Sequence, residues 1–225
     1  MLCKRVICLL TLSHGQLVRT KRFKVDRWYS IEAFEFKGAD EIVVVDVTPG
    51  EPDRVGTART VERLISEAFI PVTLGGRLRT LDDAKWAFDH GADKLLSSSM
   101  SFCAAVAERY GKQAAVFGST LQELDLGWIS GNIEACFEAS KTCGEVLVQN
   151  WPRDGSLTGY DIATIPDDMD IPYVVGSGCG NADHMIEAFK AGADGCATSC
   201  ILHFSETTLL NFKRRIQHAG FKVRM

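Results

Sequence analysis

The sequence predicts an α/β fold: a (β/α)8 barrel built from two similar half-barrels, with residues 1–225 forming one domain. Two observations predict it. Short apolar runs alternate with segments of helical period along the chain, and one stretch of strand and helix occurs twice. No linker or low-complexity tract divides the chain, and a hydrophobic content of 46% is ordinary for a globular domain.

Eight apolar runs are almost continuously hydrophobic, as expected for parallel strands that are covered on both faces. These predicted strands are Arg5–Leu12, Glu41–Val47, Ile70–Leu74, Lys94–Ser98, Ala114–Thr120, Glu145–Gln149, Ile171–Gly176 and Cys196–Cys200. The predicted helices between them include Thr60–Ala68, Leu81–His90, Ala104–Tyr110, Ala182–Ala191 and Thr207–His218. A doubly wound sheet is the alternative arrangement of the same units.

The repeated stretch indicates two related halves. Ile70–Ser98 aligns without a gap on Ile171–Ser199, 101 residues later. Matched pairs include Gly75 with Gly176 and Asp93 with Asp194. Two unrelated units rarely share so many positions in register, so we interpret the barrel as a duplicated half-barrel.

Composition and charge argue against several classes of protein. A net charge of −4 does not fit a nucleic-acid-binding surface, and the basic run Lys213–Arg215 is interpreted as a solvated face of the last helix. The apolar stretch Val6–Leu12 is too short to cross a membrane. Eight scattered cysteines lack zinc-ligand spacing. We therefore expect a cytoplasmic protein with reduced thiols, no metal, no cofactor and no membrane or nucleic-acid partner.

Small residues follow several predicted strands at the edge where parallel barrels place their active sites. Backbone amides approach a phosphate closely where no Cβ intervenes, and a following helix N-terminus favours an anion. The predicted anion-binding residues are Gly75, Gly76, Ser98 and Ser99 in the first half, and Gly155, Ser156, Ser177, Gly178, Ser199 and Cys200 in the second. They predict a ligand with two anionic ends, unless the glycines merely end the strands.

Several strings resemble the HisF family, the cyclase subunit of imidazole glycerol phosphate synthase. They are Lys4–Ile7, Gly91–Lys94, Arg153–Ser156, Thr158–Asp161 and Ala219–Arg224, and the similarity extends over essentially the whole chain. The resemblance implies a barrel that forms a heterodimer with a HisH-like glutaminase at its N-terminal face. Ammonia then passes through the barrel to an acceptor at the C-terminal face.

The resemblance also assigns roles to charged residues. It implies a gate for ammonia at the strand starts, formed by Arg5, Glu41, Lys94 and Glu145. Such a ring of two cations and two anions can close a constriction by mutual pairing. It further implies that Asp93 contacts the glutaminase and that Arg19, where the family has lysine, supplies a cation near the ligand.

Two catalytic aspartates of the family are missing. Thr11 and Thr120 occupy their positions, and a threonine hydroxyl has no pKa near neutrality with which to accept a proton. Loss of one general base costs about 10²- to 10⁴-fold in rate, so we expect weak or absent cyclase activity. The retained carboxylates Asp46 and Asp154 are then the candidate acid and base.

A narrower resemblance concerns the acceptor. Leu9–Leu12 and Gly15–Phe23 are similar to HisF-like proteins of the WbuZ type, from lipopolysaccharide and surface-glycan clusters, which work beside a separate sugar amidotransferase. We therefore expect a synthase-side subunit of a glutamine amidotransferase that feeds a phosphorylated sugar or nucleotide sugar. The alternatives are a genuine cyclase of histidine biosynthesis and a non-catalytic docking or channel protein.

Overall fold

The computed structural model describes residues 3–30, 38–121, 123–124, 127–128, 131–199, 201 and 208–225. Eight parallel strands pair side by side and close into a barrel, because the last pairs with the first. In barrel order they are β1 (Arg5–Ser13), β4 (Glu41–Asp46), β5 (Val72–Gly75), β6 (Lys94–Ser97), β7 (Ala115–Leu121), β10 (Glu145–Asn150), β11 (Tyr173–Gly176) and β12 (Gly195–Thr198). The predicted barrel is confirmed, and each predicted strand overlaps an observed one.

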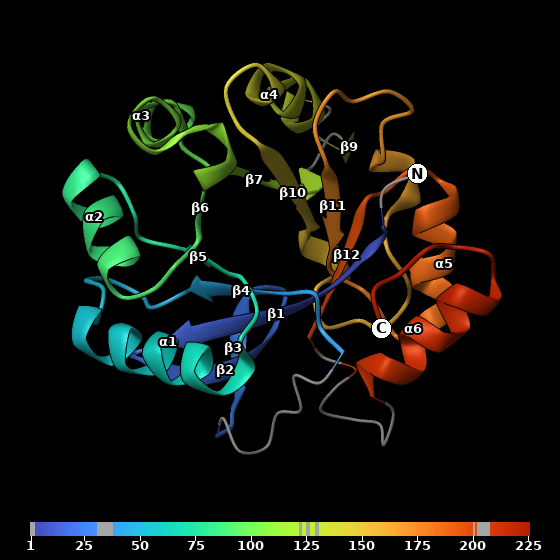
Figure 1. The fold of residues 1–225 in the computed structure, drawn as a ribbon, viewed down its shortest axis with the longest axis horizontal. Coiled ribbons are helices and arrows are strands. Elements are labelled where there is room, and N and C mark those ends of the chain that lie inside the picture. Colours follow the sequence, from blue (N-terminus) through green and yellow to red (C-terminus); the bar gives the residue numbers. More distant parts are fainter. Residues whose placement is uncertain are drawn as a thin grey trace.

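Helices surround the barrel in chain order (Figure 1). They are α1 (Arg54–Ala68), α2 (Leu81–Asp89), α3 (Met100–Tyr110), α4 (Gly131–Ser140), α5 (Ala182–Lys190) and α6 (Leu209–His218). Side-chain caps fix several helix starts: Thr80 and Asp83 form a capping box at α2, and Asn181 caps α5. Between β10 and β11 the chain forms only the short 3₁₀ turns Trp151–Arg153 and Ile162–Thr164.

Successive residues along each strand point alternately toward the helices and toward the barrel axis, which divides the apolar core into two clusters. Val6, Cys8 and Leu10 on β1 face the helices and join the large outer cluster. Ile7 and Leu9 on the same strand face the barrel axis, with Val43, Leu96, Val116, Leu147, Val174 and Ala197 from the other strands. Because successive strand residues point to opposite faces, the inner cluster forms the lining of the barrel.

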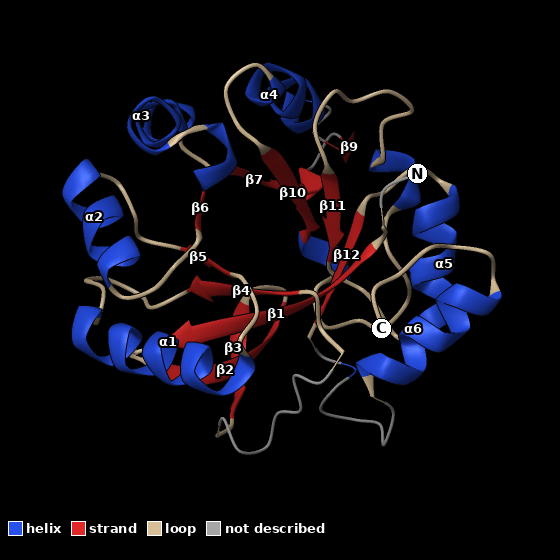
Figure 2. Cartoon of the chain, in the orientation of Figure 1, coloured by secondary structure: helices blue, strands red, loops and turns tan. Residues whose placement is uncertain are grey.

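A hairpin extends the sheet beyond β1. The strands β2 (Gln16–Lys21) and β3 (Lys24–Trp28) run antiparallel and continue the sheet on one side of β1 (Figure 2). No strand was predicted from the sequence for these residues. The turn of the hairpin contacts the segment after β10, because the amide of Phe23 donates to Asp154 Oδ2 at 2.9 Å. A second, short hairpin pairs β8 (Glu123–Leu124) with β9 (Gly127–Trp128).

The duplication has a structural counterpart at the strand starts. Asp93 accepts a hydrogen bond from the amide of Val72 at 2.8 Å, and Asp194 accepts one from the amide of Tyr173 at 3.1 Å. Val72 and Tyr173 lie 101 residues apart in the sequence, as do Asp93 and Asp194. The repeated Gly-Ala-Asp motif therefore ties each strand to the one before it.

Lys213 is buried, which corrects one expectation. Only 2% of the residue is exposed, and its Nζ lies 2.7 Å from Asp40 Oδ1. Asp40 also accepts the amide of Val6 at 2.8 Å, so the pair links α6 to the barrel. The interpretation of a solvated basic run is wrong for Lys213, whereas Arg214 and Arg215 are exposed. The sequence could not predict this pair because its partners lie 173 positions apart.

Among the described residues, no helix is long and apolar enough to cross a membrane, and no three or more potential ligands gather as a metal site. The described cysteines are free thiols, and all but Cys3 are buried.

Candidate functional site

Four charged side chains meet at the N-terminal end of the barrel. Arg5 Nη1 lies 3.1 Å from Glu41 Oε2, and Arg5 Nη2 contacts Glu145 Oε1. Lys94 Nζ lies 2.9 Å from Glu41 Oε2 and 2.8 Å from Glu145 Oε2. Thr73 adds a hydroxyl hydrogen bond to Glu41 Oε1 at 2.6 Å. Each cation therefore touches both anions, and the four residues form a closed ring, called here the charged ring.

The electrostatics of the charged ring stabilise its ionised form. Burial acts to lower the pKa values of Arg5 and Lys94, but attraction by Glu145 and Glu41, together with hydrogen bonds to the carboxylates, outweighs it and raises both pKa values. Glu41 and Glu145 are 5% and 8% exposed, against 25% and 20% for Arg5 and Lys94. The cations therefore reach toward solvent at the outer end, while the carboxylates lie inside.

A small cavity lies directly inside the charged ring. Glu41, Thr73 and Glu145 form its floor, and inner-cluster residues such as Ile7, Val43 and Val174 form its walls. The space in which the centre of a water-sized molecule can move is about 10 Å³. A cavity of this size holds about one water-sized molecule.

At the opposite end of the barrel, the first half carries a large cavity, called here the Ser98 cavity. Its volume on the same measure is about 350 Å³. Its lining includes Gly76, Arg77, Arg79, Ser98, Ser99 and Thr120. Ser99 caps α3, so the start of that helix faces the cavity. Two guanidinium groups, serine hydroxyls and a helix N-terminus suit an anion.

The turns after β5 and β11 share an unusual backbone. Gly76 and Arg77 have φ angles of 86° and 59°, and the matching Ser177 and Gly178 have 71° and 92°. In both turns, two successive residues therefore have the positive φ angles of the left-handed region. Arg77 and Ser177 hold a conformation that disfavours a Cβ, so both halves keep this turn at some cost.

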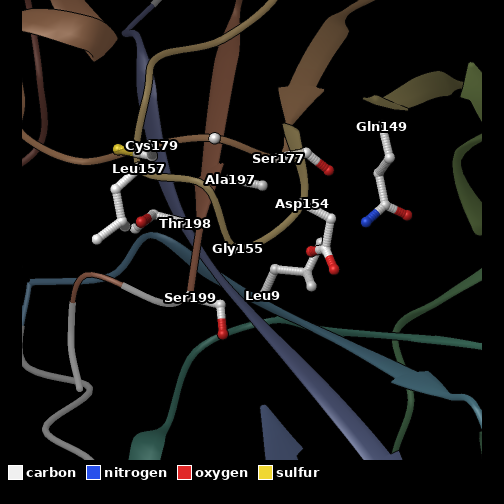
Figure 3. Close-up of a pocket in the computed structure, with 11 residues that line it drawn as sticks. Leu9, Gln149, Asp154, Gly155, Leu157, Ser177, Cys179, Ala197, Thr198 and Ser199 are labelled. Atoms are coloured by element: carbon white, nitrogen blue, oxygen red, sulfur yellow. The ribbon is translucent and has the colours of Figure 1, made fainter. Parts of the chain in front are cut away.

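The second half carries a smaller cavity, called here the Asp154 cavity, with a volume of about 30 Å³ on the same measure (Figure 3). Its lining includes Leu9, Gln149, Asp154, Ser177, Ala197 and Thr198. In the view of Figure 3, Asp154, Ser177 and Gln149 lie on one side and Thr198 lies on the other. The hydroxyls of Ser177 and Thr198 are buried without a hydrogen-bond partner among the described residues.

Asp154 is the only carboxylate among the described residues that line these two cavities. Burial raises its pKa, although the amide of Phe23, the hydroxyl of Thr20 and the charge of Arg19 act in the opposite direction. Arg19 itself pairs with Asp26 at 3.0 Å. Asp154 is therefore placed to accept hydrogen bonds or a proton in the cavity.

The other candidate acid, Asp46, is directed elsewhere. Its Oδ1 accepts the amide of Thr48 at 2.9 Å, and its Oδ2 accepts the hydroxyl of Thr57 at 3.3 Å. Asp46 is buried and lines neither cavity at the C-terminal end. Its contacts fix the loop between β4 and α1.

The two threonines at the aspartate positions also differ from each other. Thr11 is buried, and its hydroxyl donates to the carbonyl oxygen of Val18 on β2. Thr120 is half-buried and lines the Ser98 cavity. Only Thr120 therefore faces a space that admits a ligand.

The remaining predicted residues divide between the cavities. Ser199, Gly155 and Gly178 line the Asp154 cavity. Gly75 is packed against Leu96 below the Ser98 cavity, and Ser156 bonds the hydroxyl of Thr158 at 2.8 Å. Asp93 is exposed, and one of its carboxylate oxygens accepts a hydrogen bond from the amide of Val72. Cys200 lies outside the described residues.

Gln149 and Arg79 were missed as site residues by the sequence analysis. Gln149 lines both cavities, and Arg79 is an exposed cation on the Ser98 cavity with no salt bridge among the described residues. The position of Gln149 as the last residue of a predicted strand was the available signal, because side chains at strand ends reach the rim of a barrel.

Residues 5–208 match the family described as "Histidine biosynthesis protein". The chain is 30% identical over 251 positions to imidazole glycerol phosphate synthase subunit HisF of Pelodictyon phaeoclathratiforme, and all of both chains is covered. It is 29% identical to the subunits of the same name from Thermococcus gammatolerans, 99% of which is covered, and Streptococcus sanguinis, all of which is covered.

Proposed function

Because this chain belongs to the histidine biosynthesis protein family, with HisF homologues along its whole length, we propose that it is the synthase-side subunit of a glutamine amidotransferase. It receives ammonia from a HisH-like glutaminase at its N-terminal face. The barrel conducts the ammonia to an acceptor at the C-terminal face. The acceptor is a phosphorylated sugar or nucleotide sugar of lipopolysaccharide or O-antigen biosynthesis, and a sugar amidotransferase is a further partner.

The charged ring is the observation that carries this proposal. Its charges balance, and its salt bridges leave only a small cavity behind it. Neutral ammonia has the size of water and passes such a constriction when one pair separates, whereas an isolated ion would have to shed its hydration in an apolar interior. The ring, the small cavity and the inner cluster follow one another along the barrel axis.

The anion is assigned to the Ser98 cavity. Arg77 Nη2 donates to the carbonyl oxygen of Thr48 at 2.6 Å, which holds that guanidinium at the cavity wall. Arg79 adds a second cation, which is exposed and has no salt bridge among the described residues. The cavity has no carboxylate among its described lining residues, so an anionic group meets attraction alone.

The absence of both catalytic aspartates distinguishes this role from cyclisation. Thr11 is committed to β2 and has no pKa suitable for proton transfer. Without that pair, the chain positions an acceptor and delivers ammonia, and Asp154 is the acid–base group that lines the site among the described residues.

Docking and conduction are tested together by reconstitution with a HisH-like glutaminase. Addition of the chain should raise glutamine hydrolysis, and a pull-down from the source cell should recover both a glutaminase and a sugar-modifying enzyme. Arg5→Ala should alter the coupling between glutamine hydrolysis and amide transfer, while transfer from added ammonium salts should persist. Arg109→Ala, at the end of α3, is the control. No stimulation of the glutaminase would overturn the proposal.

A genuine cyclase is the second candidate, and one observation favours it: relatives of full length are named as imidazole glycerol phosphate synthase subunits. In that case Asp154 carries more of the proton transfer. Turnover of the histidine-pathway nucleotide with ammonium salts decides between the two. We expect little turnover, and turnover at the rate of a HisF subunit would favour the cyclase.

A further inference from the structure

A further cavity adjoins the Ser98 cavity and lies outside the mouth of the barrel. Its described lining residues come from the segment that leads into α1 and from the turn that leads into α2, and none belongs to a barrel strand. These two helices are neighbours in Figure 1. The volume of the cavity is about 230 Å³ on the same measure. Glu51, Arg54 and Asp83 line it, and it is called here the Arg54 cavity.

Arg77 and Arg79 line both cavities and therefore form the boundary between them. The guanidinium of Arg77 is fixed, because its Nη2 donates to the carbonyl oxygen of Thr48 at 2.6 Å. The amide of Arg79 donates to Asp83 Oδ2 at 2.9 Å, which fixes its backbone, while the side chain is exposed and has no salt bridge among the described residues. Two cations thus stand where the two cavities meet.

The charges of the Arg54 cavity favour an anion at this boundary. Arg54 Nη2 lies 2.7 Å from Asp83 Oδ1 and 2.7 Å from the carbonyl oxygen of Arg77, and its guanidinium lies over the Trp86 ring at 4.6 Å. Burial acts to raise the pKa of Asp83, but hydrogen bonds from two backbone amides and the charge of Arg54 outweigh it and lower the pKa. Because Arg54 and Asp83 neutralise each other, the two boundary arginines leave an excess of positive charge over the exposed carboxylate of Glu51.

A single phosphate does not account for two cations at this place. The Ser98 cavity alone offers about 350 Å³, whereas a water-sized molecule needs roughly 10–15 Å³ on this measure. A phosphate held beside Ser98 and Arg77 fills only part of that space and leaves Arg79 without an anion. Two linked phosphates extend from the Ser98 cavity to the boundary, where each can pair with one guanidinium.

The two cavities give different surroundings to the groups on either side of such a diphosphate. In the Arg54 cavity, the carboxylate of Glu51 can accept hydrogen bonds from ribose hydroxyls, and the planar guanidinium of Arg54 can stack on a base. In the Ser98 cavity, Thr120 and Gln149 stand at the ends of barrel strands, where the interior of the barrel opens. A group on this second side therefore lies at the mouth of the barrel.

We propose that the acceptor is a sugar linked to a nucleoside diphosphate. Its diphosphate binds Arg77 and Arg79 at the boundary, its nucleoside occupies the Arg54 cavity, and its sugar lies in the Ser98 cavity at the mouth of the barrel. This inference deepens the proposed function and rests on it, because it selects the nucleotide sugar over the phosphorylated sugar as the acceptor. The Arg54 cavity is then a nucleoside site outside the anion-binding turns.

Calorimetry on the full chain tests the diphosphate with inorganic phosphate and inorganic diphosphate as probes. Diphosphate should bind at least about tenfold more tightly, because it engages a second guanidinium. Arg79→Gln should weaken diphosphate binding about tenfold and phosphate binding less than about threefold. Arg59→Gln, which changes an exposed arginine of α1 that lines neither cavity, should alter neither affinity.

The nucleoside is tested with ADP, CDP, GDP and UDP. At least one of them should bind about tenfold or more tightly than inorganic diphosphate, because the nucleoside adds contacts in the Arg54 cavity. Glu51→Trp places a large side chain at this cavity and should abolish that difference, whereas Glu51→Gln keeps the size of the side chain and should retain it. Circular dichroism melting checks that each variant folds, and the ligand series on the wild type decides the question without them.

Three results would each overturn the inference: phosphate that binds as tightly as diphosphate, equal effects of Arg79→Gln and Arg59→Gln, or no nucleoside diphosphate that binds more tightly than inorganic diphosphate. The chain is measured without a glutaminase, so these failures differ from a failure to stimulate one, which would overturn the proposed conduit. A sugar phosphate that binds more tightly than every nucleoside diphosphate would overturn this inference and leave the conduit in place.

Discussion

Neutralising one carboxylate of the charged ring should destabilise the protein strongly. In Glu41→Gln, the amide keeps the size of the side chain and can still accept the hydroxyl of Thr73. Arg5 and Lys94 would then share Glu145 alone, which leaves one positive charge in excess. Breaking a fully buried ion pair costs about 3–5 kcal/mol, and an exposed pair contributes about 0–1 kcal/mol.

The structure places the ring between these limits. Glu41 is 5% exposed, but the two cations retain about a fifth to a quarter of their exposure. We therefore expect a loss of about 2 kcal/mol in the free energy of unfolding, which corresponds to about 4–8 °C in melting temperature for a domain of this size. Urea unfolding followed by circular dichroism measures the change.

Two further variants make the measurement specific. Glu67→Gln breaks the exposed pair with Arg63 and should cost less than about 0.5 kcal/mol. The double variant Glu41→Gln/Lys94→Met restores charge balance and should be more stable than the sum of its single variants by about 1 kcal/mol. Equal stability of wild type and Glu41→Gln would refute the interpretation of the ring as a paired, partly dehydrated network.

Three other variants test features on which the site depends. Lys213→Met should cost about 3–5 kcal/mol in urea unfolding, because Asp40 would stay buried without its cation, whereas Arg214→Met on the exposed face should cost little. Gly76→Ala should lower stability by more than Gly111→Ala: both have positive φ, but only at Gly76 would a Cβ lie 2.1 Å from a backbone oxygen. Calorimetry of Gly76→Ala should also show weaker binding of inorganic phosphate. Asp154→Asn should raise the melting temperature near pH 7, because burial raises the pKa of Asp154 and disfavours its ionised form in the folded state. That gain should fade as the pH falls through the raised pKa toward 3.8, and Asp167→Asn should show no such trend.

The strands of the barrel could be predicted because a buried parallel strand leaves a simple trace in the sequence. Runs such as Glu41–Val47 and Glu145–Gln149 begin with a charge and continue with mostly apolar residues, and both became strands with that charge at the start. The charged ring was expected from the resemblance to the HisF family, and the barrel explains why its members meet. Residues that begin barrel strands lie at one end of the barrel, however far apart they are in the chain.

Other features depend on contacts that no local pattern contains. No strand was predicted for the residues of β2 and β3. β3 is wholly exposed and has no apolar face that would predict a strand. Asp46 was a candidate acid because it lies near the end of a predicted strand. In the structure its carboxylate accepts hydrogen bonds from the amide of Thr48 and the hydroxyl of Thr57 on α1 and does not line the cavities. A prediction that Lys213 is buried would have required knowledge of where Asp40 lies.

The two halves show how one backbone supports two different sites. In both halves, two successive residues with positive φ follow the matching strand, β5 in the first half and β11 in the second. In both halves, an aspartate also accepts a hydrogen bond from the start of that strand. The side chains on this shared frame have diverged, with Arg77 and Arg79 beside one turn and Asp154 near the other. The positions that match Arg77 and Arg79, 101 residues later, are Gly178 and Gly180, and Asp154 follows β10 instead. The charges therefore do not come from equivalent positions, and the sites in the two halves differ in the element that supplies the charged group.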